Sequence, residues 1–195
     1  MKLKKLFLAI PEMSWLSWLD ACDYLAGLYV RASWGRQGLS LASTARLHYE
    51  FRSQIELDGR CSVGNFSVVL VAGSKQSISP PLLAIGDNVY IGDQTNLRAA
   101  GGVIRIGRNV LIANHVTIVA SNHGTQRGKL VVNQDWHRGD VLIEDGVWIG
   151  AGVVVLPGAV IRQDAVIAAG AVVRGEVPSN TIYGGIPAHQ IGVRS

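Results

Sequence analysis

The chain has 195 residues, of which 48% are hydrophobic and only 16% are charged, a composition that excludes a mainly disordered protein. The formal net charge is +4 and the sequence pI is near 9.3. This mild, dispersed positive charge argues against a nucleic-acid-binding protein and suits anionic small molecules or an anionic membrane surface. Cys22 and Cys61 lack metal-ligand spacing and indicate reduced cysteines in a cytoplasmic protein.

Residues 1–46 are predicted to form an N-terminal helical segment. Residues 1–10 begin like a signal peptide, but their apolar run is too short, so no signal peptide is expected. Between Met13 and Trp34, large apolar side chains recur at helical spacing, with Asp20 and Asp23 among them. This pattern predicts a helix that does not span a bilayer. Two interpretations remain open: the helix caps the end of the following domain, or it lies on an anionic membrane surface.

The repeat domain is placed at residues 47–191, with irregular six-residue units that are clear from Leu57 and begin at Leu47 at the earliest. Residues 72–81 interrupt the units and are predicted to form a turn-rich loop. A slip in the register at residues 99–105, which contain Gly101 and Gly102, predicts a bulged corner.

From Ile85 to Ile191 the sequence repeats every six residues. Each unit begins with an aliphatic residue, often has Gly or Ala second, and usually has a small or β-branched residue fifth. Neither the helical period nor a two-residue alternation gives a strict six, whereas a solenoid of short parallel strands with regular corners does. The first positions should therefore stack as an apolar ladder: Ile85, Ile91, Leu97, Ile106, Ile112, Ile118, Ile143, Ile149, Val155, Ile161, Ile167 and Val173.

Residues 124–140 leave the repeat altogether, as a loop of 17 residues. Long loops without secondary structure are uncommon inside a compact domain and often carry function. His123 stands at the root of this loop, in the outward-facing sixth position of its unit. The loop root is therefore the place where the sequence concentrates candidate chemistry.

The C-terminal coils resemble the hexapeptide-repeat acyltransferases, and most closely the sugar and exopolysaccharide O-acetyltransferases that use acetyl-CoA. The resemblance rests on four segments: Ile143–Ala151 (IEDGVWIGA), Leu156–Gly158 (LPG), Ala168–Val173 (AAGAVV) and Gly184–Ala188 (GGIPA). It implies an all-β solenoid that winds as a left-handed parallel β-helix, against the usual preference for right-handed crossovers. It also implies a homotrimer in which neighbouring subunits share each active site.

The resemblance gives His123 the role of general base, because the family places a histidine just before the extended loop. An imidazole can take the proton of a sugar hydroxyl near neutral pH as the oxygen attacks a thioester. No acyl-enzyme is required, so neither cysteine needs to be a nucleophile. The spacing of His115, His123 and His137 lacks the pattern of the hexapeptide carbonic anhydrases, so no metal is expected.

The resemblance also implies positions for the two substrates. The acetyl-CoA cosubstrate is expected in the groove between two prisms, against Trp148, Gly150, Ala151, Ala168, Ala169 and Arg174. Small side chains there permit a close approach of the pantetheine arm, and Arg174 attracts phosphates. For the acceptor, Asn96 resembles a substrate-contacting asparagine, His137 rides on the loop, and Asn122 either orients His123 or caps the loop.

The favoured hypothesis is an acetyl-CoA-dependent O-acetyltransferase that acts on a saccharide hydroxyl, in the biosynthesis of a surface polysaccharide. The alternative is a non-catalytic, trimeric hexapeptide-repeat scaffold or binding protein. The expected partners are acetyl-CoA, a sugar-containing acceptor and further copies of the chain. The expected place is the cytoplasm, with a peripheral position at the inner membrane if the N-terminal helix contacts lipid.

Overall fold

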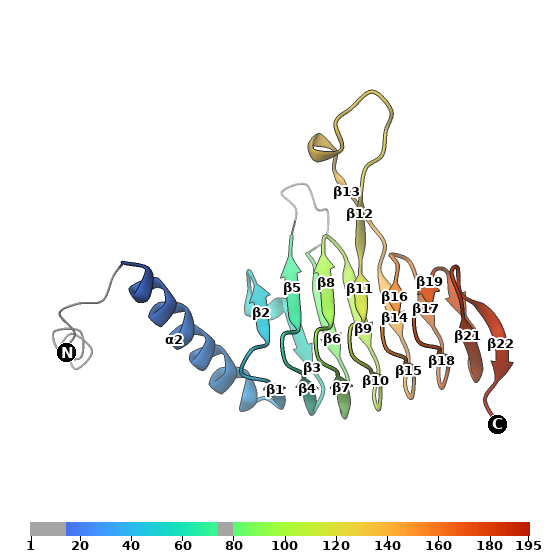
Figure 1. Cartoon of the computed structure of the whole chain (residues 1–195), viewed down its shortest axis with the longest axis horizontal. Helices are drawn as coiled ribbons and strands as arrows, with labels where there is room; N and C mark the ends of the chain where they lie inside the picture. Colours follow the sequence, from blue (N-terminus) through green and yellow to red (C-terminus); the bar gives the residue numbers. More distant parts are fainter. Residues whose placement is uncertain (1–14, 74–79) are drawn as a thin grey trace.

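The computed structural model describes residues 15–73 and 80–195. Helix α2 (Trp15–Gly35) leads into a long stack of short strands, with the C-terminus at the far end of the stack (Figure 1). The signal-peptide-like stretch at residues 1–10 and the middle of the predicted loop at 72–81 lie outside the described residues. Within the described ranges, no helix is both long enough and apolar enough to cross a membrane.

The strands form three parallel sheets, because each coil gives one strand to each face of a prism. Sheet A contains β1 (Leu39–Leu41), β4 (Cys61–Val63), β7 (Val89–Ile91), β10 (Leu111–Ile112), β15 (Trp148–Ile149), β18 (Val166–Ile167), β21 (Thr181–Gly184) and the antiparallel β22 (His189–Val193). Sheet B contains β2 (Arg46–Tyr49), β5 (Val68–Ala72), β8 (Asn96–Ala100), β11 (Thr117–Val119), β16 (Val154–Val155) and β19 (Val172–Val173). Sheet C contains β3 (Ile55–Leu57), β6 (Leu82–Ile85), β9 (Val103–Ile106), β14 (Val141–Ile143), β17 (Val160–Ile161) and β20 (Glu176–Val177). This architecture is the predicted left-handed parallel β-helix.

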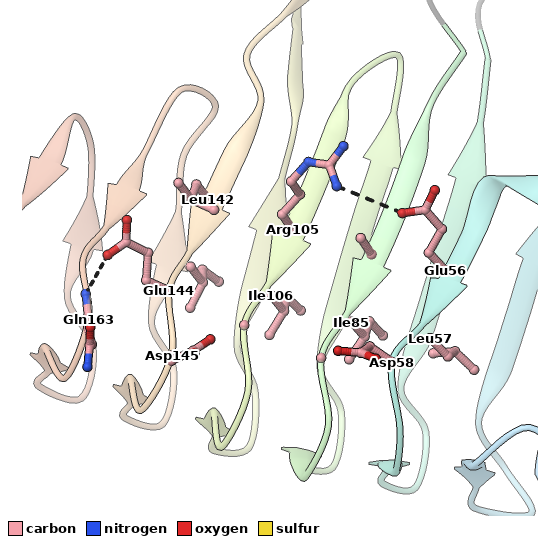
Figure 2. Close-up of a pocket in the computed structure, with 14 residues that line it drawn as sticks. Glu56, Leu57, Asp58, Ile85, Arg105, Ile106, Leu142, Glu144, Asp145 and Gln163 are labelled. Atoms are coloured by element: carbon pink, nitrogen blue, oxygen red, sulfur yellow. Dashed lines mark hydrogen bonds and ion pairs between the residues drawn. The ribbon is translucent and has the colours of Figure 1, made fainter.

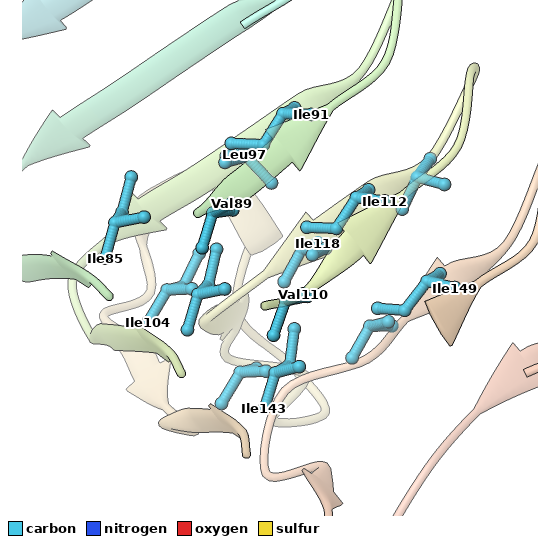
Figure 3. Close-up of a cluster of buried hydrophobic side chains, with 14 of the residues drawn as sticks. Ile85, Val89, Ile91, Leu97, Ile104, Val110, Ile112, Ile118, Ile143 and Ile149 are labelled. Carbon is cyan, nitrogen blue, oxygen red and sulfur yellow. The ribbon is translucent and has the colours of Figure 1, made fainter. Parts of the chain in front are cut away.

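The aliphatic first positions of the repeat fill the inside of the prism, as predicted. Ile91, Ile112 and Ile149 are each 0% exposed and lie in register on neighbouring strands of sheet A. Figure 3 shows these ladders of isoleucine, valine and leucine side chains facing one another across the interior. Full burial of one such side chain contributes about 1.5–3 kcal/mol. The six-residue period of the sequence therefore identifies the side chains that form the core.

The polar residues of the repeat stack one corner on the next. The Asp145 carboxylate accepts a hydrogen bond from the Arg108 N–H at 2.7 Å, one coil earlier. Asn109 has the left-handed backbone φ of 55° that such a corner requires, and asparagine tolerates this conformation well. These corners explain why Asp and Asn recur beside Gly in the repeat.

The parallel ladder begins at Leu39, where β1 pairs with β4, and thus inside the segment 1–46 that was predicted to be helical. The sequence of the first coil does not follow the six-residue period, because an extra 3-10 turn, η2 (Arg52–Gln54), is inserted between β2 and β3. Strand pairing continues across this insertion although the sequence period does not. The start of the solenoid therefore comes earlier than the expected position at residue 47.

The last turn of α2 closes the N-terminal end of the prism through Trp34. This side chain is 1% exposed, meets the Tyr49 ring edge-on at a centroid distance of 5.7 Å, and lies under the Arg52 guanidinium. Further back in the helix, Leu25 and Tyr29 are exposed. The described part of α2 therefore covers the first coil only at its C-terminal end.

Candidate active site

The chain leaves the prism after Ala120 and returns at Val141. Strands β12 (Ser121–His123) and β13 (Trp136–Arg138) pair antiparallel, and η3 (Val131–Asn133) lies near the tip. This 121–138 hairpin projects well beyond the rest of the stack (Figure 1). The loop predicted at residues 124–140 thus has secondary structure of its own. His123 is exposed and lies just before it, in β12, the first strand of the hairpin.

The root of the hairpin is fixed to the coil that precedes it. The Ser121 hydroxyl donates a hydrogen bond to the Ala100 carbonyl, and the Asp140 carboxylate accepts one from the Val103 N–H at 2.8 Å. These contacts fall on the register slip at residues 99–105, where the turn at Gly101 and Gly102 is buried. The hairpin root is therefore attached to the turn between β8 and β9, the place where the sequence predicts a bulged corner.

Asp140 also pairs with Arg138, whose guanidinium donates two hydrogen bonds of 2.7 Å to the carboxylate. Burial by itself would raise the pKa of Asp140. The hydrogen bonds from the Arg138 guanidinium and the Val103 N–H outweigh that effect and hold the pKa below its ordinary value. The carboxylate that ends the hairpin therefore stays charged.

Trp136 is the aromatic neighbour of His123. The two residues stand directly opposite each other in the hairpin, and their rings meet nearly perpendicular, at 83°, with centroids 6.0 Å apart. Directly opposed residues share one face of an antiparallel pair. In the part of the chain that the structure describes, no group hydrogen-bonds the His123 ring. The loop has no periodic pattern, so sequence reasoning did not single out Trp136.

Asn122 and His137 form the adjacent opposed pair, and both are exposed. Successive residues of a strand point to opposite faces, so this pair lies on the other face of the hairpin from His123. Asn122 occupies the fifth position of its six-residue unit, a position that is buried in the other units. It is exposed instead, because the ladder of inward positions ends at Ala120 and the chain has already left the prism. The structure therefore places Asn122 and His137 together, but apart from His123.

Asn96 lies on the outward face of β8, in register with Thr117. Its side-chain oxygen is buried and has no hydrogen-bond partner within the described chain. The same strand ends at Ala100, whose carbonyl holds the hairpin root. The described residues therefore leave the hydrogen-bonding capacity of this amide oxygen unused.

The small residues predicted to receive acetyl-CoA divide into two kinds. The N–H groups of Gly150 and Ala168 already donate to carbonyls of the next coil at 2.8 and 2.7 Å, and a Cβ at Gly150 would lie 2.7 Å from the Ala169 nitrogen. Ala151 and Ala169 are exposed at the same corner, and within the described residues their N–H groups have no partner. Gly150 and Ala168 therefore serve coil stacking, while Ala151 and Ala169 offer free donors.

Trp148 and Arg174 lie on different sides of the prism. Trp148 is 50% exposed on sheet A, whereas Arg174 is exposed just after β19, where sheet B turns toward sheet C. Arg174 makes no ion pair with any described residue, in contrast to Arg162, which is held by Glu144 and Glu176 at 2.9 and 2.8 Å. The two predicted contacts therefore do not share one face of the prism.

A groove of ≈ 490 Å³ runs along the outer face of sheet C (Figure 2). Its charged groups largely pair within the protein: Glu56 lies 3.9 Å from Arg105, and the Glu144 carboxylate accepts a hydrogen bond from the Gln163 N–H. A hydrogen bond from the Arg162 guanidinium lowers the pKa of Glu144. The predicted site residues do not line this groove. Nor, among the described residues, do His, Cys, Asp or Glu side chains gather in a group that could hold a metal ion.

The chain forms a parallel β-helix built from six-residue repeats, and an exposed histidine lies at the root of a hairpin that projects from it. These features define a protein of the hexapeptide-repeat class. The family model described as "Bacterial transferase hexapeptide (six repeats)" matches residues 140–175. The chain is 31% identical over 146 residues to the Escherichia coli (strain K12) protein named "Putative lipopolysaccharide biosynthesis O-acetyl transferase WbbJ", covering 71% of this chain and 74% of that protein. It is 33% identical over 125 residues to the galactoside O-acetyltransferase of the same strain, covering 61% of each.

Solved structures show the same fold. The N-acyltransferase AntD from Bacillus cereus superposes with a TM-score of 0.68 at 18% identity, covering 84% of this chain and 88% of that chain. The hexapeptide-repeat acetyltransferase VCA0836 from Vibrio cholerae superposes with a TM-score of 0.51 at 25% identity, covering 85% and 80%. The chain belongs to the bacterial hexapeptide-repeat transferases, and it is an acyltransferase.

Proposed function

We propose that the protein transfers the acetyl group of acetyl-CoA to a hydroxyl group of a saccharide. The observation that carries this proposal is the exposed His123 at the root of a fixed hairpin, in a chain of the transferase family. Two relatives named for O-acetyl transfer, one of them for lipopolysaccharide biosynthesis and one for galactosides, support a sugar acceptor. They favour a role in surface polysaccharide biosynthesis. They also argue against the alternative of a non-catalytic scaffold.

In this mechanism His123 acts as the general base. It removes the proton of the acceptor hydroxyl while the hydroxyl oxygen bonds to the thioester carbonyl carbon. As the tetrahedral intermediate collapses, the carbon–sulfur bond breaks, and the imidazolium returns the proton to the leaving thiolate. The products are an acetyl ester and free CoA thiol. Backbone N–H groups of a neighbouring coil would stabilise the oxyanion.

The proposed contacts to the donor come from the exposed corner of Ala151 and Ala169 and from two side chains on different sides of the prism. The free N–H groups of Ala151 and Ala169 would bind the pantetheine arm, Trp148 would line the groove, and Arg174 would pair with phosphates. Gly150 and Ala168 would act by letting the coils approach closely. Together these residues fit the donor only in a groove between two subunits.

The acceptor would contact three further residues. The unpartnered oxygen of Asn96 would accept a hydrogen bond from a sugar hydroxyl. Asn122 and His137, on the other face of the hairpin from His123, would contact the acceptor from a neighbouring subunit. No metal ion takes part in this proposal.

A homotrimer would bring these surfaces together. Its support is an apolar row on the outer face of sheet A, where Tyr90, Leu111 and Trp148 lie in register and are 46%, 44% and 50% exposed. Exposed apolar rows of this kind mark protein interfaces. Sedimentation equilibrium tests the assembly, since a monomeric mass at micromolar concentration would contradict it.

The proposed division of the chain is an N-terminal segment, whose helix ends at Gly35, and a repeat domain whose strand ladder begins at Leu39. Its proposed place is the cytoplasm or the inner membrane. Leu25, Leu28 and Tyr29 are exposed on α2 and would enter an anionic lipid surface. Co-sedimentation with vesicles of anionic and of neutral lipid tests this contact. If the chain binds neither kind of vesicle, α2 acts only as a cap.

The deciding experiment measures release of free thiol from acetyl-CoA, with a panel of sugars and nucleotide sugars as acceptors. The wild-type chain should show acceptor-dependent release, and His123→Ala should lower it at least about a hundredfold, within the usual range for a general base. His48→Ala is the matched control, because His48 is exposed in β2 and far in sequence from the hairpin. Equal activity of His123→Ala and wild type would overturn the proposal.

A further inference from the structure

His123 stands in a hairpin that the prism does not surround, so its side chain is exposed to water. An exposed side chain is free to change rotamer, and each change would move the imidazole nitrogens away from the reacting hydroxyl. A general base at this position therefore needs a contact that restrains its ring. The hairpin itself supplies one such contact, from the strand opposite His123.

That contact is the indole of Trp136. The two rings meet edge to face, with centroids 6.0 Å apart and an angle of 83° between their planes. This is a favoured geometry for aromatic pairs, because the positive edge of one ring meets the negative face of the other. The pairing of His123 with Trp136 across the two strands keeps both side chains on the same face.

The indole itself packs against the preceding coil, at Gly101. Trp136 is half-buried, and a Cβ added to Gly101 would lie 2.8 Å from its Cε3 atom and 3.7 Å from the Cβ of Ser121. Gly101 also has a left-handed backbone φ of 69°. The absence of a side chain at residue 101 therefore opens the space that the indole occupies against the prism.

We infer that Trp136 is a positioning residue for the acyl transfer, and that Gly101 acts through it: the coil fixes the indole, and the indole holds the imidazole of His123. This inference rests on the proposed role of His123 as general base. Trp136 neither accepts nor donates the transferred proton. It raises the fraction of molecules in which the imidazole is oriented for reaction.

The first test is kinetic. Trp136→Ala should lower kcat about tenfold, equivalent to about 1.4 kcal/mol, and leave the KM for acetyl-CoA unchanged. Trp136→Phe should recover most of kcat, since a phenyl ring can still meet the imidazole edge to face. Val132→Ala, at the 80% exposed tip of the same hairpin, is the control that should behave as wild type.

The second test asks whether Gly101 acts through Trp136. Gly101→Ala should lower kcat, and adding it to Trp136→Ala should cause no further loss, because both changes remove the same contact. Gly158→Ala controls for backbone strain: Gly158 occupies the equivalent corner two coils later, has a φ of 84°, and has open space around its Cβ position. Additive losses in the double variant would overturn the role of Gly101.

The third test needs no acceptor and separates this inference from the proposed function. The NMR signals of the His123 ring, assigned by their absence in His123→Ala, should carry a ring-current shift that disappears in Trp136→Ala. If those signals are the same with and without the indole, the positioning role is wrong, whatever the base is. If the shift disappears while His123→Ala keeps full transfer, the contact exists and the proposed function is what fails.

Discussion

The carboxylate of Asp140 accepts a hydrogen bond of 2.8 Å from the N–H of Val103, and this contact ties the end of the 121–138 hairpin to the preceding coil. The two residues are 37 positions apart in the chain. Together with Arg138, Asp140 forms a clamp at the point where the chain re-enters the prism. Loss of the clamp should affect the hairpin far more than the prism.

Asp140→Ala should therefore loosen the hairpin and leave the fold intact. The variant leaves the Val103 N–H without its acceptor and Arg138 without its partner. We expect trypsin to cut after Arg127 or Lys129 several times faster than in wild type, with a fall in Tm of only a few degrees. Asp135→Ala, an exposed carboxylate of the same loop, is the control. Unchanged cleavage in Asp140→Ala would contradict the clamp.

The clamp should also depend on pH. Because the folded-state pKa of Asp140 lies below its ordinary value of 3.8, the clamp contributes stability that is fully present above that ordinary value. This contribution is lost as the pH falls through the folded-state pKa. Hydrogen exchange across the hairpin, followed by mass spectrometry from pH 6 to pH 2.5, should show protection falling at the acid end. Asp140→Asn should lack this dependence, and an identical profile in wild type and variant would count against it.

The thiol of Cys61 should be unreactive in the folded chain. Burial raises its pKa to about 12, so at pH 8 it is protonated as well as covered. In a Cys22→Ser background, which leaves Cys61 as the single thiol, alkylation should be slow in buffer and fast in guanidinium chloride. Rapid alkylation in buffer would show that the second coil opens readily.

The same raised pKa predicts an alkaline effect with a defined sign. The unfolded thiol ionises near its ordinary pKa of 9.0 while the folded thiol stays protonated to about 12. The free energy of unfolding should therefore decline as the pH rises through this interval. Cys61→Ala should show a smaller decline in denaturant titrations at pH 8 and pH 10.

Substitutions in the apolar ladder should cost stability in proportion to the volume removed. Ile149 is 0% exposed and stacks between Ile112 and Ile167. Ile149→Ala should lower the free energy of unfolding by about 2–5 kcal/mol, and Ile149→Val by about 0.5–1.5 kcal/mol. Urea denaturation measures both. A loss below 0.5 kcal/mol for Ile149→Ala would show that the coils collapse to fill the cavity.

The core could be predicted from the sequence because its cause is local and periodic. Ile91, Ile112 and Ile149 repeat the same environment, so one rule places all of them. The first coil departs from that rule at Arg52–Gln54, and the strand at Leu39 was therefore missed. Backbone pairing between coils, which does not depend on a six-residue period, restores the ladder there.

The site could be predicted only in part, for a related reason. The break in the repeat identified His123 and the length of the loop beside it. What the loop does depends on contacts between segments that are distant in sequence, such as Trp136 against Gly101. No pattern in the loop sequence predicts these contacts, and none predicts that Asn122 is exposed. The predicted roles of the substrate-binding residues remain predictions.

Because the coils stack uniformly, the number of coils between two sites determines the distance between them along the axis of the prism. The hairpin leaves at the edge between sheets B and C, and Arg174 follows β19 at the same edge two coils later. Adjacent parallel strands are about 4.8 Å apart, so the two places are separated by about 10 Å along the axis. Insertion or deletion of one complete coil between these two places would change that separation by one strand spacing. The reach of such a protein toward a long substrate can thus be set by counting coils.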